Sequence, residues 1–181
     1  MALLRLEVAV DLAVADDHLP LGVGRDVMFV GDQDDGLSLG VKFSEEVDDL
    51  LAVLRPGVSA LFGSEVAVAR SLALLRRGDV VLAIDLRRYE RWVLDAADRA
   101  AAAGAVLVAV TDSLLSPLAQ RATASFVVSA GGAGPFDSHV GTLSLLNALV
   151  AACAGRLRKS AGERIDRIEA GWSERNALIE P

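Results

Sequence analysis

Apolar residues follow two alternating patterns along the chain. Short continuous apolar runs, bounded by glycine, aspartate or serine, are typical of buried strands. Five such runs predict strands at 27–30, 58–62, 80–84, 105–110 and 125–128. Because these runs are continuous rather than interleaved with polar residues, we expect both faces of the sheet to be covered.

The segments between the strands carry apolar residues at helical spacing. They predict helices at 37–54, 63–78, about 90–103, 116–122 and 136–157. Ser64 is the expected N-cap of the second of these helices, and Pro117 is expected at the first position of the fourth, where its missing N–H costs nothing. An amphipathic helix is expected over 1–20 and a polar helix over 158–181.

Strands that alternate with helices predict parallel pairing through right-handed crossovers. We therefore expect an α/β fold, a three-layer α/β/α doubly wound sheet of five parallel strands in the order 2-1-3-4-5, as in flavodoxin-like proteins. No repeat, linker or low-complexity segment divides the sequence. We expect one domain over 1–181, with its α/β core at 25–157.

Composition and charge narrow the function classes. Hydrophobic residues make up 52% of the chain but aromatic residues only 4%, as in α/β proteins built from small, closely packed layers. The formal net charge of −7 repels nucleic-acid phosphates and anionic membrane surfaces. We therefore expect no direct nucleic-acid binding and no membrane association. The start of the chain has no signal-peptide cleavage pattern and nothing indicates secretion, so we expect a cytoplasmic protein. The lone Cys153 excludes an internal disulfide and is expected to be a small buried residue rather than a nucleophile.

The first candidate site is the acidic loop GDQDDG at 31–36, after the first strand. Its aspartates at 32, 34 and 35 repel one another unless they are solvated or hold a cation. Solvated acids at a helix start are one interpretation, and a Mg²⁺ site is the other. The cluster also imitates a phosphorylation receiver domain, but such domains need a lysine after strand five, where this chain has SAGGAGP.

The second candidate site is the stretch DLRRYER at 85–91, directly after the third strand. Ligands of open α/β sheets bind at the carboxyl ends of the strands. Arginines are unusual at a helix start because the helix dipole opposes them. Arg87 and Arg88 therefore indicate a negative partner, which is either the nearby aspartates (Asp85 and the acids at 32–35) or an anionic ligand gripped through the guanidinium groups.

Several segments, taken in order, resemble sugar isomerase (SIS) domains and, more narrowly, the effector domain of RpiR-type transcriptional regulators. The resemblance rests on the strand start GDVV, on TDS and SPLA after strand four, and on FDSHVGTLSLLNALVAA, and it runs from about 25 to 157. It implies a domain that senses phosphosugars, usually behind a helix-turn-helix. No helix-turn-helix fits here, since only about one helix precedes the first strand.

A second departure concerns the phosphate-binding turn. SIS domains hold the sugar phosphate with a turn of the form S-x-S-G-x-T after strand three, where this chain has DLRRYER. Arg87 and Arg88 are therefore either a replacement phosphate clamp or a plug for the cleft. The resemblance implies a ligand cleft, without cofactor or metal, lined by loop residues: Asp32, Gln33, Asp34, Ser64, Asp85, Arg87, Arg88, Thr111, Ser113, Ser138 and His139.

Three functions are open at this stage. The first is a non-catalytic sensor of a sugar or sugar phosphate, forming a homo-oligomer, either a dimer or a tetramer. The second is an aldose–ketose phosphosugar isomerase, for which His139 and Glu65 are the candidate bases. The third is a degenerate SIS domain that acts only in protein–protein interaction.

Overall fold

The computed structural model describes residues 27–31, 49–61, 65–132 and 137–177. Several of the features expected above lie outside these residues: the helix over 1–20, the proposed N-cap Ser64, and the acidic loop with Asp32, Gln33 and Asp34. Of the helix predicted at 37–54, residues 49–54 are described, and they are helical.

Five strands form one sheet in the order β2-β1-β3-β4-β5. Each pair of neighbours is parallel, which confirms the predicted parallel α/β fold. Each strand also lies within one residue of its predicted bounds: β1 Val27–Gly31, β2 Val58–Leu61, β3 Val80–Ile84, β4 Val106–Thr111 and β5 Ala124–Val127. The carboxyl ends of β3 and β4 therefore lie side by side at one edge of the sheet.

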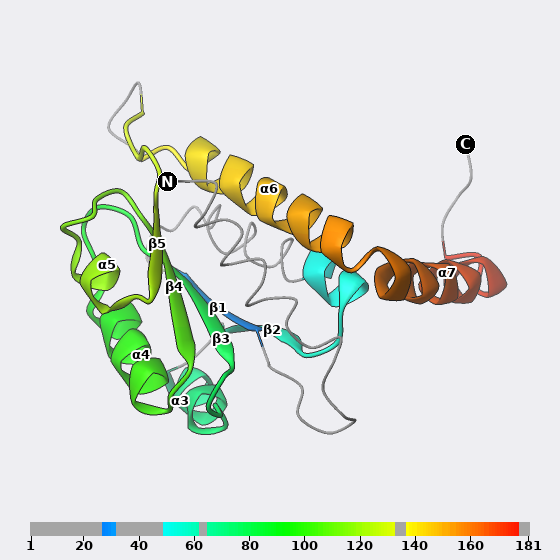
Figure 1. Ribbon diagram of the computed structural model, residues 1–181, viewed down its shortest axis with the longest axis horizontal. Coiled ribbons are helices and arrows are strands. Elements are labelled where there is room, and N and C mark those ends of the chain that lie inside the picture. The colour runs from blue at the N-terminus through cyan, green and yellow to red at the C-terminus, as the bar shows by residue number, and fades with distance from the viewer. Residues whose placement is uncertain (1–26, 32–48, 62–64, 133–136, 178–181) are drawn as a thin grey trace.

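Helices cover both faces of this sheet (Figure 1). One face is covered by α3 (Glu65–Ala73), α4 (Arg91–Ala102) and α5 (Pro117–Arg121). The other is covered by residues 49–54 and α6 (Val140–Arg156), and α7 (Arg158–Glu174) follows α6. Pro117 opens α5 as expected, and the preceding Ser116 caps it, since its Oγ accepts a hydrogen bond of 3.0 Å from the Ala119 N–H.

Three helices are shorter than their patterns predicted, among them the helix expected over 158–181, which ends at Glu174. The helix expected to reach residue 78 ends at Ala73, because the chain then turns: the Asp79 carboxylate accepts the Arg76 N–H at 2.6 Å, and Gly78 has a positive φ of 92°. The helix expected from 136 begins at Val140. Before it, the Ser138 N–H donates to the Ala130 carbonyl at 2.9 Å, which holds this segment against the preceding loop instead of in a helical turn.

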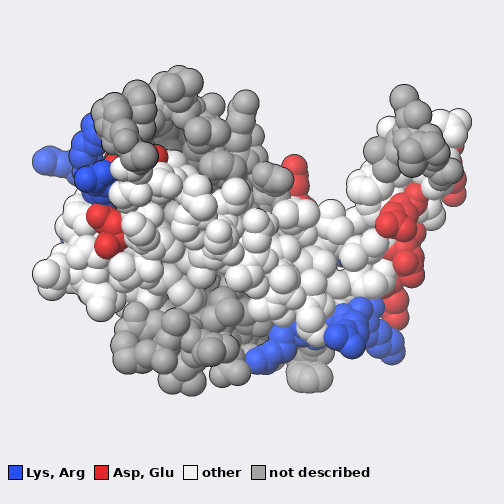
Figure 2. Space-filling view, turned by 90° about the horizontal axis from the view of Figure 1, so that it is seen from above, with Lys and Arg blue, Asp and Glu red and all other residues white. Residues whose placement is uncertain are grey.

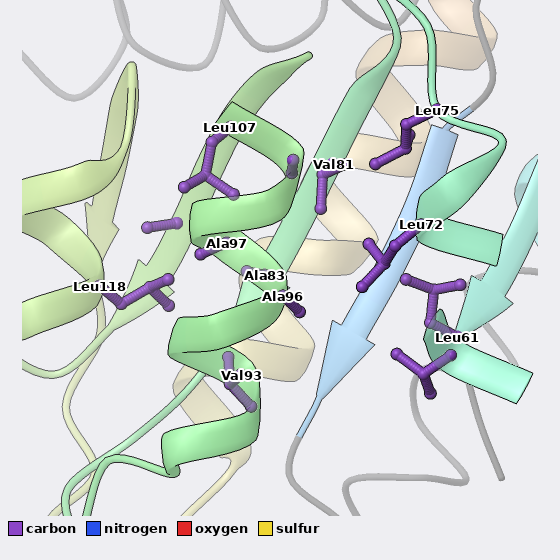
Figure 3. Packing of buried hydrophobic residues seen from close by; sticks show 13 residues of the cluster. Leu61, Leu72, Leu75, Val81, Ala83, Val93, Ala96, Ala97, Leu107 and Leu118 are labelled. Atoms are coloured by element: carbon purple, nitrogen blue, oxygen red, sulfur yellow. The ribbon is translucent and has the colours of Figure 1, made fainter. Parts of the chain in front are cut away.

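The core under α4 is built from small and medium side chains (Figure 3). Val81 and Ala83 of β3 and Leu107 of β4 face the helix, which presents Val93 and Ala97 to them. Alanines on both surfaces let the helix approach the sheet closely, which accounts for the high alanine content and the few aromatic residues.

The opposite face of the sheet carries a second core. Leu82, Val110 and Phe126 point to this side, where Leu146 and Cys153 of α6 cover them. Since successive strand residues alternate between the two faces, continuous apolar strands serve both cores, as predicted.

Cys153 is 1% exposed, and burial raises the pKa of its thiol to about 11, which the Arg55 charge only partly offsets. We expect the native protein to react with an aromatic disulfide reagent at pH 8 at least about 100-fold more slowly than the urea-unfolded chain, because only the thiolate attacks. Absorbance of the released thiolate measures both rates. Equal rates in the two states would contradict the buried placement.

Within the described part of the chain, no single helix is long and apolar enough to cross a membrane. Helices α6 and α7 taken together have the length and composition of a membrane span, but the chain bends by 101° at their junction. The apolar side of α6 packs on the sheet.

Candidate functional site

The candidate site begins with the loop that follows β3. Asp85 is 1% exposed, its N–H donates to the Val110 carbonyl at 3.0 Å, and its Oδ2 accepts the N–H of Glu90, the residue before α4, at 3.1 Å. The backbone of Asp85 thus binds to β4, while its carboxylate binds the last residue before α4, and together these bonds fix the shape of the loop between β3 and α4.

Arg87 lies at the turn of this loop in the left-handed conformation, with φ of 53°. That conformation costs a residue with a β-carbon about 1 kcal/mol. Two contacts hold it there: its N–H donates to Asp112 Oδ1 at 3.2 Å, and its Nη1 lies 2.5 Å from Asp137 Oδ1. Arg87 thereby joins three segments: the loops after β3 and β4, and the approach to α6.

The described partner of Arg87 is a carboxylate that the sequence did not suggest. The guanidinium pairs with Asp137, which lies 50 positions further along the chain, whereas of the expected partners the acids at 32–35 lie outside the described residues. Asp85 is committed to the loop backbone, so the nearest carboxylate in the sequence serves a different purpose. Arg88 is exposed and forms no ion pair with the residues that the structure describes.

Tyr89 completes the contact between the two loops. Its hydroxyl donates to Asp112 Oδ1 at 2.9 Å, so this one carboxylate oxygen accepts from both Tyr89 and the Arg87 backbone. Burial raises the pKa of Tyr89 above its ordinary value, and the hydrogen bond to Asp112 and its negative charge raise it further, while the Thr111 hydroxyl lowers it. The phenol is therefore a firm hydrogen-bond donor at neutral pH.

Tyr89 is the only tyrosine of the chain, so its titration can be followed directly. We expect the Asp112→Asn variant to titrate at a lower pH than the wild type, because the substitution removes the charge that disfavours tyrosinate. The absorbance of tyrosinate measures this, with the exposed Asp98→Asn as the matched control. A raised pKa also means that the protonated Tyr89 contributes to the free energy of unfolding. This contribution is complete below about pH 10, the pKa of an unfolded tyrosine, and is lost as the pH rises through the pKa of the folded state. An unchanged titration in Asp112→Asn would contradict the contact.

The other expected ligand residues are spread around the same edge. Thr111, the last residue of β4, is completely buried. The Ser113 Oγ accepts the Leu115 N–H at 3.1 Å, which shapes the loop after β4. Ser138 and His139 are partly exposed just before α6, and His139 is its N-cap residue without a capping bond from its side chain. The structure thus brings the loops after β3 and β4 together with the start of α6.

Three residues of this site were not among the sequence-based candidates: Tyr89, Asp112 and Asp137. A usable signal existed for Asp112, which is the second residue after the strand predicted at 105–110 and therefore lies, like Asp85, at the carboxyl end of a strand. Asp137 was assigned to a helix, so its role as a loop carboxylate was not visible.

No group of three His, Cys, Asp or Glu side chains is placed to hold a metal ion in the described ranges. The Mg²⁺ hypothesis concerned the loop at 31–36, whose residues 32–36 lie outside those ranges. The described site is instead one of mixed charge, with two arginines and three aspartates around two loops and a helix start.

Comparison with known proteins places this geometry in a family. A family model described as the SIS domain matches residues 51–152, more than half of the chain. No curated protein matches the sequence. Among solved structures, the chain is similar to the sugar isomerase domain of an RpiR transcription factor from Sphaerobacter thermophilus, with 26% identity and a TM-score of 0.78 over 92% of this chain and 86% of that one.

Two further structures share the fold. One is the Vibrio vulnificus NanR protein in complex with ManNAc-6P, with 17% identity and a TM-score of 0.73 over 97% of this chain and 62% of that one. The other is a putative sugar-phosphate isomerase from Listeria monocytogenes, with 19% identity and a TM-score of 0.61 over 88% of this chain and 76% of that one.

Proposed function

The chain belongs to the SIS domain family, and from this premise we propose that it is a non-catalytic domain that senses a phosphorylated sugar within a transcriptional regulator of the RpiR type. The similarity to an RpiR sugar isomerase domain and to NanR bound to ManNAc-6P supports this choice of ligand and role. The proposal treats 1–181 as one cytoplasmic domain that forms a homo-oligomer, uses no cofactor or metal, and makes no direct contact with nucleic acid.

The observation that carries the proposal is the exposure of the Arg87 side chain and of its ion pair with Asp137. Its side chain is 51% exposed, whereas that of its partner Asp137 is 12% exposed, so the guanidinium lies at the surface of the site with one edge on a carboxylate. An ion pair of this exposure contributes only about 0–1 kcal/mol, because water screens it. A ligand phosphate can displace such a partner at small cost.

A phosphate group has the chemistry to compete for this guanidinium. A phosphomonoester carries a charge of about −1.5 to −2 at pH 7 and binds arginine through two parallel hydrogen bonds. Arg88 is exposed beside Arg87 and adds a second positive charge. Released from Arg87, the Asp137 carboxylate becomes available to accept hydrogen bonds from sugar hydroxyls.

Thermal unfolding in the presence of sugar phosphates tests the proposal. We expect ManNAc-6P or a related sugar phosphate to stabilise the wild type, by about 2.7 kcal/mol at a concentration 100 times its Kd, whereas the unphosphorylated sugar gives less. Arg87→Ala should weaken binding by about tenfold or more, since a hydrogen bond between charged groups is lost. Arg99→Ala is the matched control, because Arg99 lies in the last turn of α4, away from this loop.

The same experiment has outcomes that overturn the proposal. Stabilisation by no sugar phosphate would favour the third hypothesis, in which the Arg87–Asp137 pair closes a degenerate site and the domain acts only through protein contacts. Stabilisation that Arg87→Ala leaves unchanged would remove Arg87 from the site.

The similarity to a putative sugar-phosphate isomerase favours a second candidate function, aldose–ketose isomerisation. Among the described residues, His139 is the base that this reaction would use, since it is partly exposed two positions after Asp137. Interconversion of an aldose phosphate and its ketose isomer by the wild type, lost in His139→Ala with sugar-phosphate binding retained, would establish this function in place of the first.

A further inference from the structure

Helix α7 stands away from the rest of the molecule. It bends by 101° from the direction of α6 and leaves the body as an arm (Figures 1 and 2). Its root is anchored: Ala161 is 3% exposed, and the Arg164 Nε donates to the Ala52 carbonyl at 3.0 Å. Beyond the root the helix is largely exposed, and Trp172 near its end is 43% exposed.

An apolar seam runs along this arm. Ala161, Ile165, Ile168 and Trp172 follow one another at intervals of four, three and four residues, which puts them on one face of the helix at the inner positions of a heptad repeat. At the root the seam packs on the core, where Ile165 contacts the cluster beneath α6. Further out it continues past the body, where a tryptophan is left in contact with water.

In the described part of the chain, the space beside the seam is open at two positions. A β-carbon added at Gly162 or at Gly171, which flank the seam, would meet no other atom within 4 Å. Another helix can therefore approach the arm closely on this side. The glycines alone do not indicate what approaches.

The charges that border the seam favour a second copy of the same helix. In heptad terms Arg164 takes position g and Glu169 takes position e, five residues later. In a parallel helix pair, position g of one helix faces position e of the other five residues along, and such pairs fix orientation. In a parallel pair, Arg164 of each copy faces Glu169 of the other, which gives two attractive contacts. In an antiparallel pair, g positions face g positions and e positions face e positions, so like charges would meet.

We infer that two copies of this chain associate through α7, with the helices parallel and with Ile168 and Trp172 in the seam. The Arg164 bond to Ala52 uses only Nε, so the terminal nitrogens of the guanidinium remain available to face the second copy. Because Ala161 and Ile165 pack on the chain's own core, only Ile168 and Trp172 of the seam are left for a second copy, and the association is expected to depend on concentration.

Sedimentation of the whole chain over a range of concentrations tests the inference. Arg164→Glu and Glu169→Arg should each weaken the dimer by about tenfold, since each turns two attractive pairs into two repulsive ones of about 0.3–0.5 kcal/mol apiece. An equimolar mixture of the two variants should recover a heterodimer, because the introduced charges then meet each other and the native pair is also restored. Trp172→Ala should weaken the dimer as well.

Glu163→Arg is the matched control. It makes the same change of charge as Glu169→Arg six residues earlier, on the side of α7 opposite the seam, and it should leave the dimer unchanged. A wild type that stays monomeric throughout would overturn the inference. So would a dimer that the single charge changes leave intact, or a mixture of the two variants that stays as dissociated as each alone.

Discussion

Replacing Leu118 by alanine is expected to lower the free energy of unfolding by about 2–5 kcal/mol. Leu118 is completely buried although it lies in α5, a helix of only five residues. It belongs to the core that α4 and the sheet share, with Val93, Ala97 and Leu107 (Figure 3). Since this core consists mainly of alanine and valine, few side chains nearby are long enough to fill the space that a leucine leaves.

Leu115 supplies the matched control three residues earlier. It is 82% exposed, so Leu115→Ala makes the same chemical change and should alter stability by less than about 0.5 kcal/mol. Urea unfolding followed by tryptophan fluorescence measures both variants. If both lost the same amount of stability, the assignment of α5 to the core would be wrong.

Replacing Asp85 by alanine is expected to lower the free energy of unfolding by about 1–3 kcal/mol, because it leaves the Glu90 N–H at the start of α4 without the acceptor that now binds it. The loss should also reach the site. The loop that Asp85 holds carries Arg87 and Tyr89, so sugar-phosphate binding should weaken together with stability.

The conservative variant separates the two roles of that carboxylate. Asp85→Asn keeps an oxygen for the Glu90 N–H and should cost less than Asp85→Ala. Asp98→Ala is the surface control, since its ion pair with Arg121 at 2.7 Å is exposed and is worth no more than about 1 kcal/mol. Chemical denaturation measures all three variants. A cost for Asp85→Ala no larger than for Asp98→Ala would show that the loop does not depend on this contact.

The sheet was predictable because its signals are local. The five residues of β3 are apolar and are bounded by Asp79 and Asp85, and since aspartate is depleted in strands, the pattern predicted both ends correctly. The crossover rule for parallel strands then left few possible arrangements. The family resemblance rested on the same segments, and the SIS match covers most of them.

The site was less predictable because its contacts are not local. Arg87 meets a carboxylate 50 positions away, and Asp112 accepts from two residues of another loop. The left-handed backbone of Arg87 has no signal in residue type, since glycine or asparagine is its usual mark. Sequence reasoning placed Asp85, Arg87 and Arg88 after the third strand, where the structure has them, but it did not predict that Asp112 and Asp137 contact Arg87.

The seclusion of Cys153 has a practical consequence for labelling. Cys153 is the only cysteine in the chain, and its thiol is 1% exposed with a pKa raised to about 11. We therefore expect the native protein to react very slowly with maleimide reagents. A cysteine introduced on the outer turns of α7 would then carry a spin label or fluorophore alone. The distance between two such probes would report the relative orientation of the arms without any need to remove a native residue.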